Sequence, residues 1–303
     1  MKFPTTQIGF EQRFSTEEAC LEYFVNLKFK DGYKCNSCGY DKYWLMSRRR
    51  VGCQKCKKRV SLTTGTIFEQ SNKPLLLWFR VIWLMIAQKN GISAVGVQRI
   101  MGFGSYRTAW AWLHKLRMVT VLSSRTKLNG KVEVDETLLG GKVAGKRGRG
   151  AEGKILVGIA VEVIGRRTGR VRLSALPDAS RKSLKKFITG NIEEDSELIT
   201  DGWKSYESIE GFKHTIIHNG ATDEEENLLP NVHRIASLLK RWLLGTHQNY
   251  VTGNKVQNYL DEFTFRYNRR KSNSRGLLFQ RVLEQVVSHN PITYAKVFES
   301  ADK

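Results

Sequence analysis

The sequence predicts a multidomain α+β protein. Three observations predict this class. Four cysteines form two closely spaced pairs near the N-terminus, the region that follows has helical periodicity, and the C-terminal half alternates strand-like and helix-like segments. The expected domain boundaries are 1–70, 71–128 and 129–303.

The charge of the chain is unevenly distributed. The 303 residues include 50 Lys and Arg against 29 Asp and Glu, a net charge of +21. Residues 1–130 hold 22 basic and 7 acidic side chains, a net charge of +15. Between Gln70 and Val132 there are ten basic residues and no acidic one. Because surfaces normally mix both signs, we expect a polyanionic partner, a nucleic acid. The alternative is a generic basic surface.

Neither a membrane span nor a signal peptide is expected. The longest apolar run, Leu75–Ala87, has 13 residues with Arg80 inside it, whereas a span needs about 20. The N-terminal segment lacks the apolar stretch of a signal peptide. We therefore expect a cytoplasmic, nucleoid-associated protein.

Four of the five cysteines form a metal-ligand pattern. They are Cys35, Cys38, Cys53 and Cys56. Two residues separate the members of each pair, and such pairs place four thiolates around one tetrahedral Zn²⁺. Tyr43–Met46 and Arg50–Val51 between them predict short strands, so we expect a zinc ribbon with structural zinc. The alternative, two disulfides, is disfavoured in a cytoplasmic protein. Cys20, in a helix expected over Phe14–Lys28, is predicted to be a buried core thiol.

Residues 71–128 predict a helix-turn-helix-like DNA-binding domain. Helices are expected over Pro74–Gln88, Ser93–Met101 and Ser105–Leu122, with glycines between the last two. The core face of the last helix consists of Ala109, Trp112, Leu113, Leu116 and Val119. Another face holds Arg107, Trp110, His114 and Arg117. We expect this second face to read a DNA groove. The alternative is an ordinary three-helix bundle with a solvated basic edge.

The C-terminal half predicts an RNase H-like α/β domain. Strands are expected over Val132–Leu139, Ile155–Ile164, Arg170–Leu176, Glu197–Thr200 and Thr215–Ile217, and a helix over Arg181–Ile192. Three strands, a helix and a further strand fit the RNase H-like order. The loop 140–154 is expected to be a hairpin tip that contacts the DNA backbone, through Arg147 and Arg149.

Two acids stand out by position. Asp135 lies inside the first of these strands, and Asp201 lies where the fourth one stops. A carboxylate inside a central strand costs free energy unless it binds a partner or a ligand. Glu133 shares the pleat face of Asp135, whereas Glu136 is expected on the opposite face. If either acid is considered alone, the better interpretation is an unrelated surface residue.

A later helix adds a histidine and a lysine. In the helix expected over Asn231–Leu243, the apolar stripe is Ile235, Leu238, Leu239 and Trp242. His233 and Lys240 lie nearly opposite that stripe and two turns apart. A metal ligand and a phosphate-binding lysine suit this spacing, although a lone histidine on a helix is usually polar surface.

These segments together resemble bacterial insertion-sequence transposases of the ISXO type, with an N-terminal zinc ribbon and a DDE-like RNase H fold. The resemblance covers nearly the whole chain. It rests on the four-cysteine ribbon with Gly39, Val132–Thr137 followed by Gly140 and Gly141, Thr200–Tyr206, Val232–Arg234 leading into Leu239–Arg241, and Tyr259–Phe263 with Arg266–Arg270.

The resemblance implies a DNA transposase that binds terminal inverted repeats and catalyses metal-dependent cleavage and strand transfer. It implies Asp135 and Asp201 as ligands of two Mg²⁺ (or Mn²⁺) ions, with His233 at a third position that is Glu, Asn or His in the family. Lys240 would assist, and Lys240 and Arg241 would hold the terminal DNA strand. A homodimer or higher oligomer is expected because two ends must meet.

The third position leaves alternatives open. Imidazole is a softer ligand than Mg²⁺ prefers, so His233 would either bind the metal or transfer a proton. Glu262, or an acid within 223–226, is the alternative source of a third carboxylate. At the level of function, the alternatives are a non-catalytic (domesticated) sequence-specific DNA-binding protein and a structure-selective nuclease on the same fold.

Overall fold

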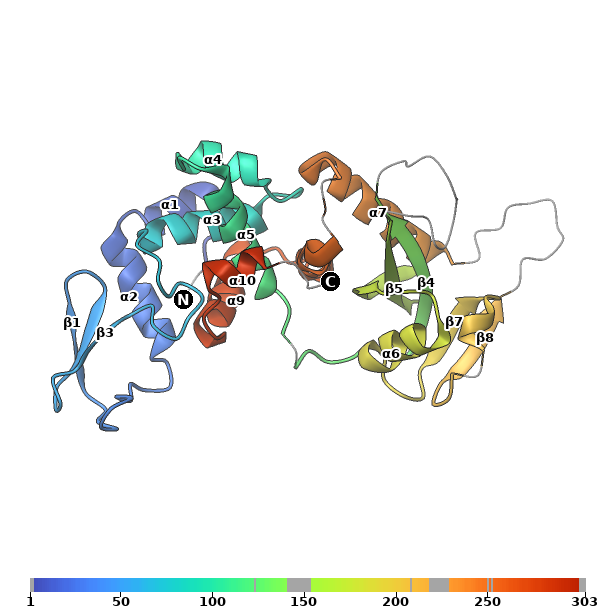
Figure 1. Ribbon diagram of the computed structural model, residues 1–303, viewed down its shortest axis with the longest axis horizontal. Helices are drawn as coiled ribbons and strands as arrows, with labels where there is room; N and C mark the ends of the chain where they lie inside the picture. Colours follow the sequence, from blue (N-terminus) through green and yellow to red (C-terminus); the bar gives the residue numbers. More distant parts are fainter. Residues whose placement is uncertain are drawn as a thin grey trace. The chain divides into compact units, whose positions relative to one another are not determined.

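The computed structural model describes residues 3–122, 124–140, 154–207, 209–217, 229–249, 251 and 253–299. Contacts divide the chain into two compact units, which are shown in Figure 1. The first contains residues 1–122 together with 272–303, and the second contains 123–271. This division differs from the expected boundaries, because the last 32 residues do not cluster with the strands that precede them.

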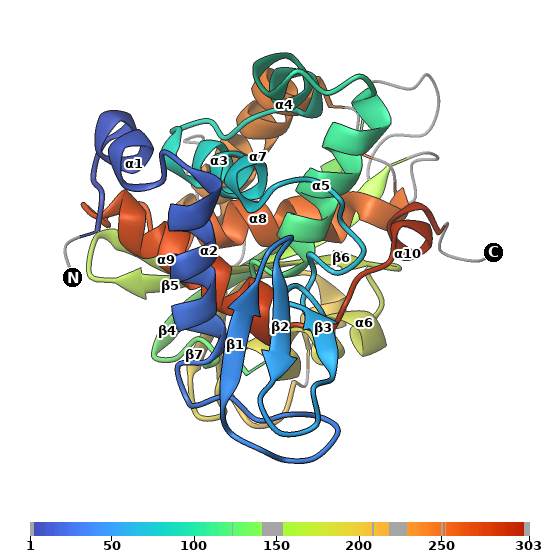
Figure 2. The same cartoon turned by 90° about the vertical axis from the view of Figure 1, so that its left-hand side faces the viewer.

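The first unit begins with two helices and a small sheet. Helix α1 spans Gln7–Arg13, and α2 spans Glu17–Lys28. Each begins at a threonine whose hydroxyl accepts a backbone N–H of its first turn. Strands β1 (Tyr43–Met46), β2 (Arg50–Cys53) and β3 (Arg59–Ser61) form an antiparallel sheet beside α2, as Figure 2 shows. The expected ribbon strands are confirmed, and β3 is added to them.

Three helices follow the ribbon in the order that the sequence predicts. They are α3 (Leu75–Ala87), α4 (Ala94–Met101) and α5 (Tyr106–Met118). Gly102 ends α4 with a left-handed φ of +65°, which glycine adopts without steric cost. The hydroxyls of Ser93 and Ser105 cap α4 and α5. The helix-turn-helix-like arrangement therefore has its expected caps and turn.

The C-terminal helices complete the core of this first unit. Helix α9 spans Arg275–Ser288 and α10 spans Tyr294–Phe298. The Phe279 ring of α9 lies 5.3 Å from the Phe10 ring and 5.2 Å from the Phe79 ring, measured between centroids. The Gly276 N–H donates to the Pro4 carbonyl oxygen at 2.9 Å. Apolar packing against the first helices thus explains why residues 272–303 belong to this unit.

The second unit is built on a five-stranded mixed sheet of order β6-β5-β4-β7-β8. The strands are β4 (Lys131–Leu139), β5 (Ile155–Ile164), β6 (Arg167–Leu176), β7 (Glu197–Asp201) and β8 (Lys213–Ile217). The first three are antiparallel neighbours, while β7 and β8 run parallel to β4. Three strands, a helix and further strands follow one another along the chain as predicted for an RNase H-like domain, and β4 lies at the centre of the sheet.

Helices cover both faces of the sheet (Figure 1). Helix α6 (Arg181–Asn191) packs on the face that holds Val132, Val134 and Ala160. Helices α7 (Pro230–His247) and α8 (Val256–Asn268) pack on the face that holds Val157, Ile159 and Val171. Short 3₁₀ turns lie at Lys204–Tyr206 (η1) and Gly253–Lys255 (η2). In the part of the chain that the structure describes, no helix is long and apolar enough to cross a membrane.

Candidate active site

The two predicted aspartates lie on neighbouring parallel strands. Glu133 of β4 pairs with Ile199 of β7, so two residues further along the same register lead to Asp135 and Asp201. Residues in register share a pleat face, and Asp201 is the last residue of β7. Both carboxylates therefore lie where β4 and β7 part, the place at which open α/β sheets bind ligands.

The start of α7 brings the predicted histidine to this place. His233 Nε2 lies 3.6 Å from Asp135 Oδ2, while the His233 side chain stays 51% exposed. The predicted helix faces are confirmed, because Ile235 and Leu239 are fully buried and Lys240 is exposed. The structure thus brings Asp135 and His233 together and leaves the imidazole accessible.

The electrostatics of the site are those of crowded carboxylates. Burial is the main reason why the pKa of Asp135 rises from 3.8 to about 7, and the negative charges of Glu136 and Asp201 raise it further. The Glu136 N–H, which donates to Asp135 Oδ1 at 2.7 Å, acts in the opposite direction. Oxygen ligands with this excess of negative charge suit a divalent cation, which would neutralise it.

Glu136 and Tyr206 interact electrostatically with the aspartates, which the sequence did not predict. Glu136 lies on the far pleat face, as expected, because it pairs with Gly158 whereas Asp135 pairs with Ile159. Its charge nevertheless raises the pKa of Asp135. Tyr206 of η1 is fully buried, and its pKa is raised well above the usual value by burial and by the charges of Glu136, Asp135 and Asp201. The signal for Tyr206 was its place in the segment that begins with Thr200.

The acids that the sequence offered as alternative sources of a third carboxylate are Glu262 and those within 223–226. Glu262 is fully buried in α8. The charges that raise the pKa of Asp135 most are those of Glu136 and Asp201 rather than that of Glu262. The acids within 223–226 lie outside the described residues. Of the described acids, Glu136 and Asp201 thus act on Asp135 more strongly than Glu262 does.

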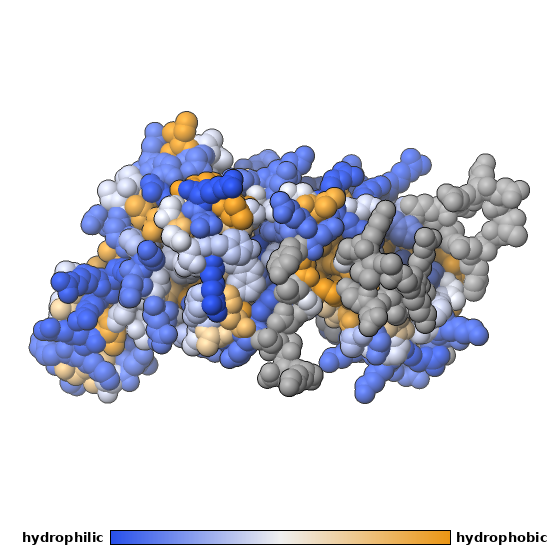
Figure 3. All heavy atoms as spheres, turned by 45° about the horizontal axis from the view of Figure 1, so that its top comes forward, coloured by the Kyte–Doolittle hydropathy of each residue, from blue (hydrophilic) through white to orange (hydrophobic). Residues whose placement is uncertain are grey.

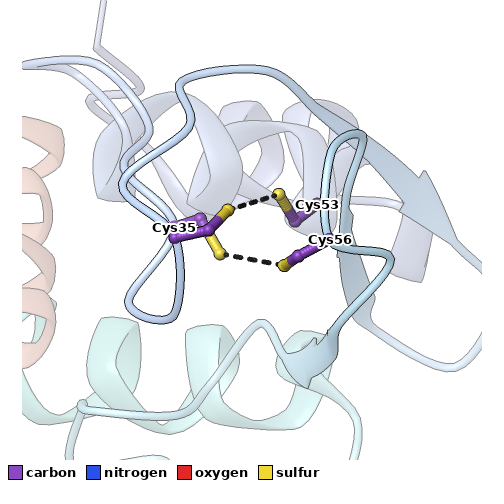
Figure 4. Close-up of side chains that lie close together, drawn as sticks. Cys35, Cys53 and Cys56 are labelled. Atoms are coloured by element: carbon purple, nitrogen blue, oxygen red, sulfur yellow. Dashed lines mark hydrogen bonds between the residues drawn. The ribbon is translucent and has the colours of Figure 1, made fainter.

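The four ribbon cysteines converge on one point (Figure 4). All four Sγ atoms lie within 4.8 Å of one another, and the Cys35–Cys56 and Cys38–Cys53 pairs are 3.7 and 3.6 Å apart. A tetrahedron with Zn–S bonds of about 2.3 Å has edges of about 3.8 Å. The donor set and its spacing therefore fit structural zinc rather than disulfides. Cys20 is buried, and burial raises its pKa to about 12, as expected of a core thiol.

Two models of known protein families match this chain. Residues 127–268 match the ISXO2-like transposase domain, and residues 15–59 match the transposase zinc-ribbon domain. The chain thus contains an ISXO2-like transposase domain and a transposase zinc-ribbon domain. The first match includes both aspartates and His233, and the second includes the four cysteines.

A relative from Halobacterium salinarum resembles this transposase-family chain over most of its length. It is described as an uncharacterized protein in transposable element ISH50. The two are 24% identical over 282 residues, which cover 84% of this chain and 91% of the relative.

The structure corrects the predicted groove-reading face of α5. His114 and Arg117 are 0% and 1% exposed, so they do not form an exposed face with the other two residues. The Phe298 ring of α10 lies 5.0 Å from the Trp110 ring and 4.3 Å from the Arg107 guanidinium carbon. Helix α10 therefore covers part of the face that we expected to contact DNA.

The other predicted DNA contacts of this transposase-family chain fall in two groups. Lys240 and Arg241 are exposed on α7. Arg147 and Arg149 lie outside the described residues. Figure 3 shows a face of the molecule on which hydrophilic residues predominate. Lys240 and Arg241 are therefore the predicted DNA contacts that the structure describes as exposed near His233 in sequence, and Arg234, which directly follows His233, is exposed as well.

Proposed function

We propose that this chain is the transposase of an insertion sequence, that it binds the terminal inverted repeats of the element, and that it catalyses metal-dependent strand cleavage and transfer. The observation that supports this most is the approach of His233 to Asp135 where β4 and β7 part. The electrostatic influence of Asp201 on the same carboxylate adds to it.

Asp135, Asp201 and His233 would hold the catalytic metal. When bound, Mg²⁺ activates water or a 3′-hydroxyl for in-line attack on a phosphodiester and stabilises the leaving oxygen. The half-exposed imidazole of His233 would bind the metal or transfer a proton to or from the reacting groups at Nε2. The carboxylates of Asp135 and Asp201 orient the reacting groups because their strands are paired in the sheet.

The DNA would be held by basic side chains near this site. Lys240 and Arg241 lie two turns along α7 from His233 and are exposed, so their charges can reach phosphates. The ribbon, with structural zinc, and the helix-turn-helix-like region would contribute further contacts to double-stranded DNA. Two element ends must meet for transposition, and we therefore propose that the active form on DNA is a homodimer or a higher oligomer.

A cleavage and joining assay tests the proposal. The substrate is a duplex that ends in the inverted repeat of the element, supplied with Mg²⁺ or Mn²⁺ and a target duplex. We expect cleaved and joined products with the wild type and neither product with Asp135→Asn or Asp201→Asn. Cleavage without joining would favour a structure-selective nuclease. Footprinting without cleavage under either metal would favour a non-catalytic DNA-binding protein.

A further inference from the structure

Glu133 is a buried acid that the proposed chemistry does not use. Its side chain is 5% exposed, and it lies two residues before Asp135 on the same pleat face of β4. Glu133 Oε2 accepts the backbone N–H groups of Asn231 at 2.9 Å and Val232 at 3.0 Å. Glu133 Oε1 accepts the Asn231 side-chain amide at 2.7 Å. One carboxylate of the sheet thus binds the start of α7 three times.

Helix α7 depends on this carboxylate for its N-terminal cap. Its first residue is Pro230, which has no N–H, and Leu229 before it offers no capping side chain. The His233 N–H donates to the Leu229 carbonyl oxygen at 3.0 Å. Between these two positions, the N–H groups of Asn231 and Val232 are both taken by Glu133. The free donors of the first turn are therefore satisfied by a residue from another element.

A second strand fixes the same turn. The Thr168 hydroxyl of β6 donates to Asn231 Oδ1 at 2.7 Å, and Thr168 and Asn231 are each 7% exposed. The Arg234 guanidinium donates to the Thr168 hydroxyl at 3.3 Å. The Asn231 amide is thus held at both ends, by β4 through Glu133 and by β6 through Thr168. These contacts leave the first turn of α7 little freedom to move over the sheet.

We propose that Glu133 is a positioning residue that holds the His233 imidazole opposite the Asp135 carboxylate. Glu133 and Asp135 are about 7 Å apart along one strand, and Val232, which Glu133 binds, directly precedes His233. Any shift of the first turn relative to β4 therefore changes the distance between His233 and Asp135. The catalytic consequence rests on the proposed function, whereas the positioning itself does not.

A purely stabilising role is the competing explanation, because the same device occurs where no site residue follows. Glu17 of α2 accepts the N–H groups of Leu75 and Leu76, at 2.9 and 2.8 Å, at the start of α3. A matched control within the sheet is Glu162 of β5, also 5% exposed. It accepts the N–H groups of Asn129 and Arg170 at 3.1 and 3.0 Å. Glu162→Gln thus breaks a buried network of the same sheet whose donors, which include the Arg170 guanidinium, come from outside α7.

The first arm of the test is metal-free and measures His233 directly. The ¹⁵N resonances of the His233 imidazole are recorded at one pH in the full chain with isotope-labelled histidine. We expect Glu133→Gln to move them toward their positions in Asp135→Asn, and Thr168→Val, a milder change, to move them less in the same direction. Glu162→Gln should leave them in place. Resonances of both Glu133→Gln and Thr168→Val at the wild-type positions would overturn the proposal.

The second arm measures single-turnover cleavage of inverted-repeat DNA at saturating Mg²⁺. Loss of a residue that orients a ligand typically costs about 10–100-fold, and we expect this loss for Glu133→Gln. The double variant Glu133→Gln/His233→Ala should be no slower than His233→Ala alone, because Glu133 acts through His233. Losses that multiply would overturn the positioning role. If the resonances shift but the wild type cleaves no DNA, the proposed function fails and the positioning stands.

Discussion

His233 Nε2 of α7 and Asp135 Oδ2 of β4 lie 3.6 Å apart, and the acid that caps α7 stands two residues before Asp135 on the same strand. The histidine and its partner are therefore joined twice, once directly and once through Glu133. A site built in this way holds the exposed imidazole of α7 in a fixed position next to the sheet, which is what proton transfer or metal binding requires.

Zinc removal should unfold the ribbon selectively. The ribbon has a small core, so the metal supplies much of its folding free energy. We expect about one zinc per chain in the wild type and almost none in Cys35→Ser, together with fast proteolysis of residues 29–70. The measurement is metal content by mass spectrometry, followed by limited proteolysis. The control is Cys20→Ala, which should keep its zinc. Full zinc content in Cys35→Ser would contradict the assignment.

Asp261 should make the free energy of unfolding depend on pH. Burial raises its pKa from 3.8 to about 6, although the Gln257 amide donates to it at 2.9 Å. The folded state thus favours the protonated acid, so this group lowers the free energy of unfolding as the pH rises from about 4 to about 6. We expect Asp261→Asn to be more stable than the wild type by about 1–3 kcal/mol at pH 7, and equal to it near pH 3.5. Urea unfolding at both pH values measures this.

The pKa of Asp178 is shifted in the opposite direction from that of Asp261. Hydrogen bonds from Ser180 and Ser183 lower the pKa of this exposed acid to about 2. Its stabilising contribution is present above pH 4 and is lost as the pH falls toward 2. Asp178→Asn should therefore be less stable than the wild type at pH 7. If Asp261→Asn and Asp178→Asn changed the free energy of unfolding in the same direction at pH 7, the opposite pKa shifts of these two acids would be contradicted.

Lys240 and Arg241 should contribute to DNA affinity through phosphate contacts. Each contact that is lost reduces the slope of log affinity against log salt by about 0.9. We expect Lys240→Ala and Arg241→Ala to bind inverted-repeat DNA more weakly, each with a slope shallower by about 1. Fluorescence anisotropy at several salt concentrations measures both quantities. Lys186 on α6, which covers the opposite face of the sheet, is the control. An unchanged slope in both α7 variants would exclude these contacts.

Burial changes the expected effect of replacing Arg117. Because its side chain is 1% exposed, Arg117→Met should lower the free energy of unfolding by about 2–3 kcal/mol. Arg107 is exposed, so Arg107→Ala should change stability by less than about 0.5 kcal/mol. Thermal and urea unfolding of the two variants measure the difference. Wild-type stability of Arg117→Met would contradict a structural role for this arginine.

Most of the fold was predictable because its signals are local. The cysteine spacing predicted the ribbon. The serine caps and Gly102 predicted α4 and α5, and the β-branched runs predicted the strands. The return of α9 and α10 to the first unit was not predictable. Helical periodicity marks an apolar face but does not say which distant segment covers it. For this reason the face of α5 that holds His114 and Arg117 was expected to be exposed.

The site was predictable only in part for the same reason. The positions of Asp135 and Asp201 relative to their strands, and the resemblance to the family, indicated the acids and His233. Glu136 lies on the far pleat face as predicted, but pleat alternation alone gave no reason to count its charge among those that raise the pKa of Asp135. The role of Glu133 depends on its contact with Asn231, 98 positions further along the chain. Contacts of this range leave no pattern in a single sequence.

Manganese binding tests the central claim, a metal site formed by Asp135, Asp201 and His233, most directly. Electron paramagnetic resonance of the zinc-loaded full chain titrated with Mn²⁺ counts the bound ions without requiring DNA or turnover. We predict that Asp135→Asn/Asp201→Asn weakens this binding by more than about 10-fold, since even partners behind the ligands cost 10–100-fold. His233→Ala should weaken it less. Equal Mn²⁺ binding by the wild type and the double aspartate variant would contradict the site.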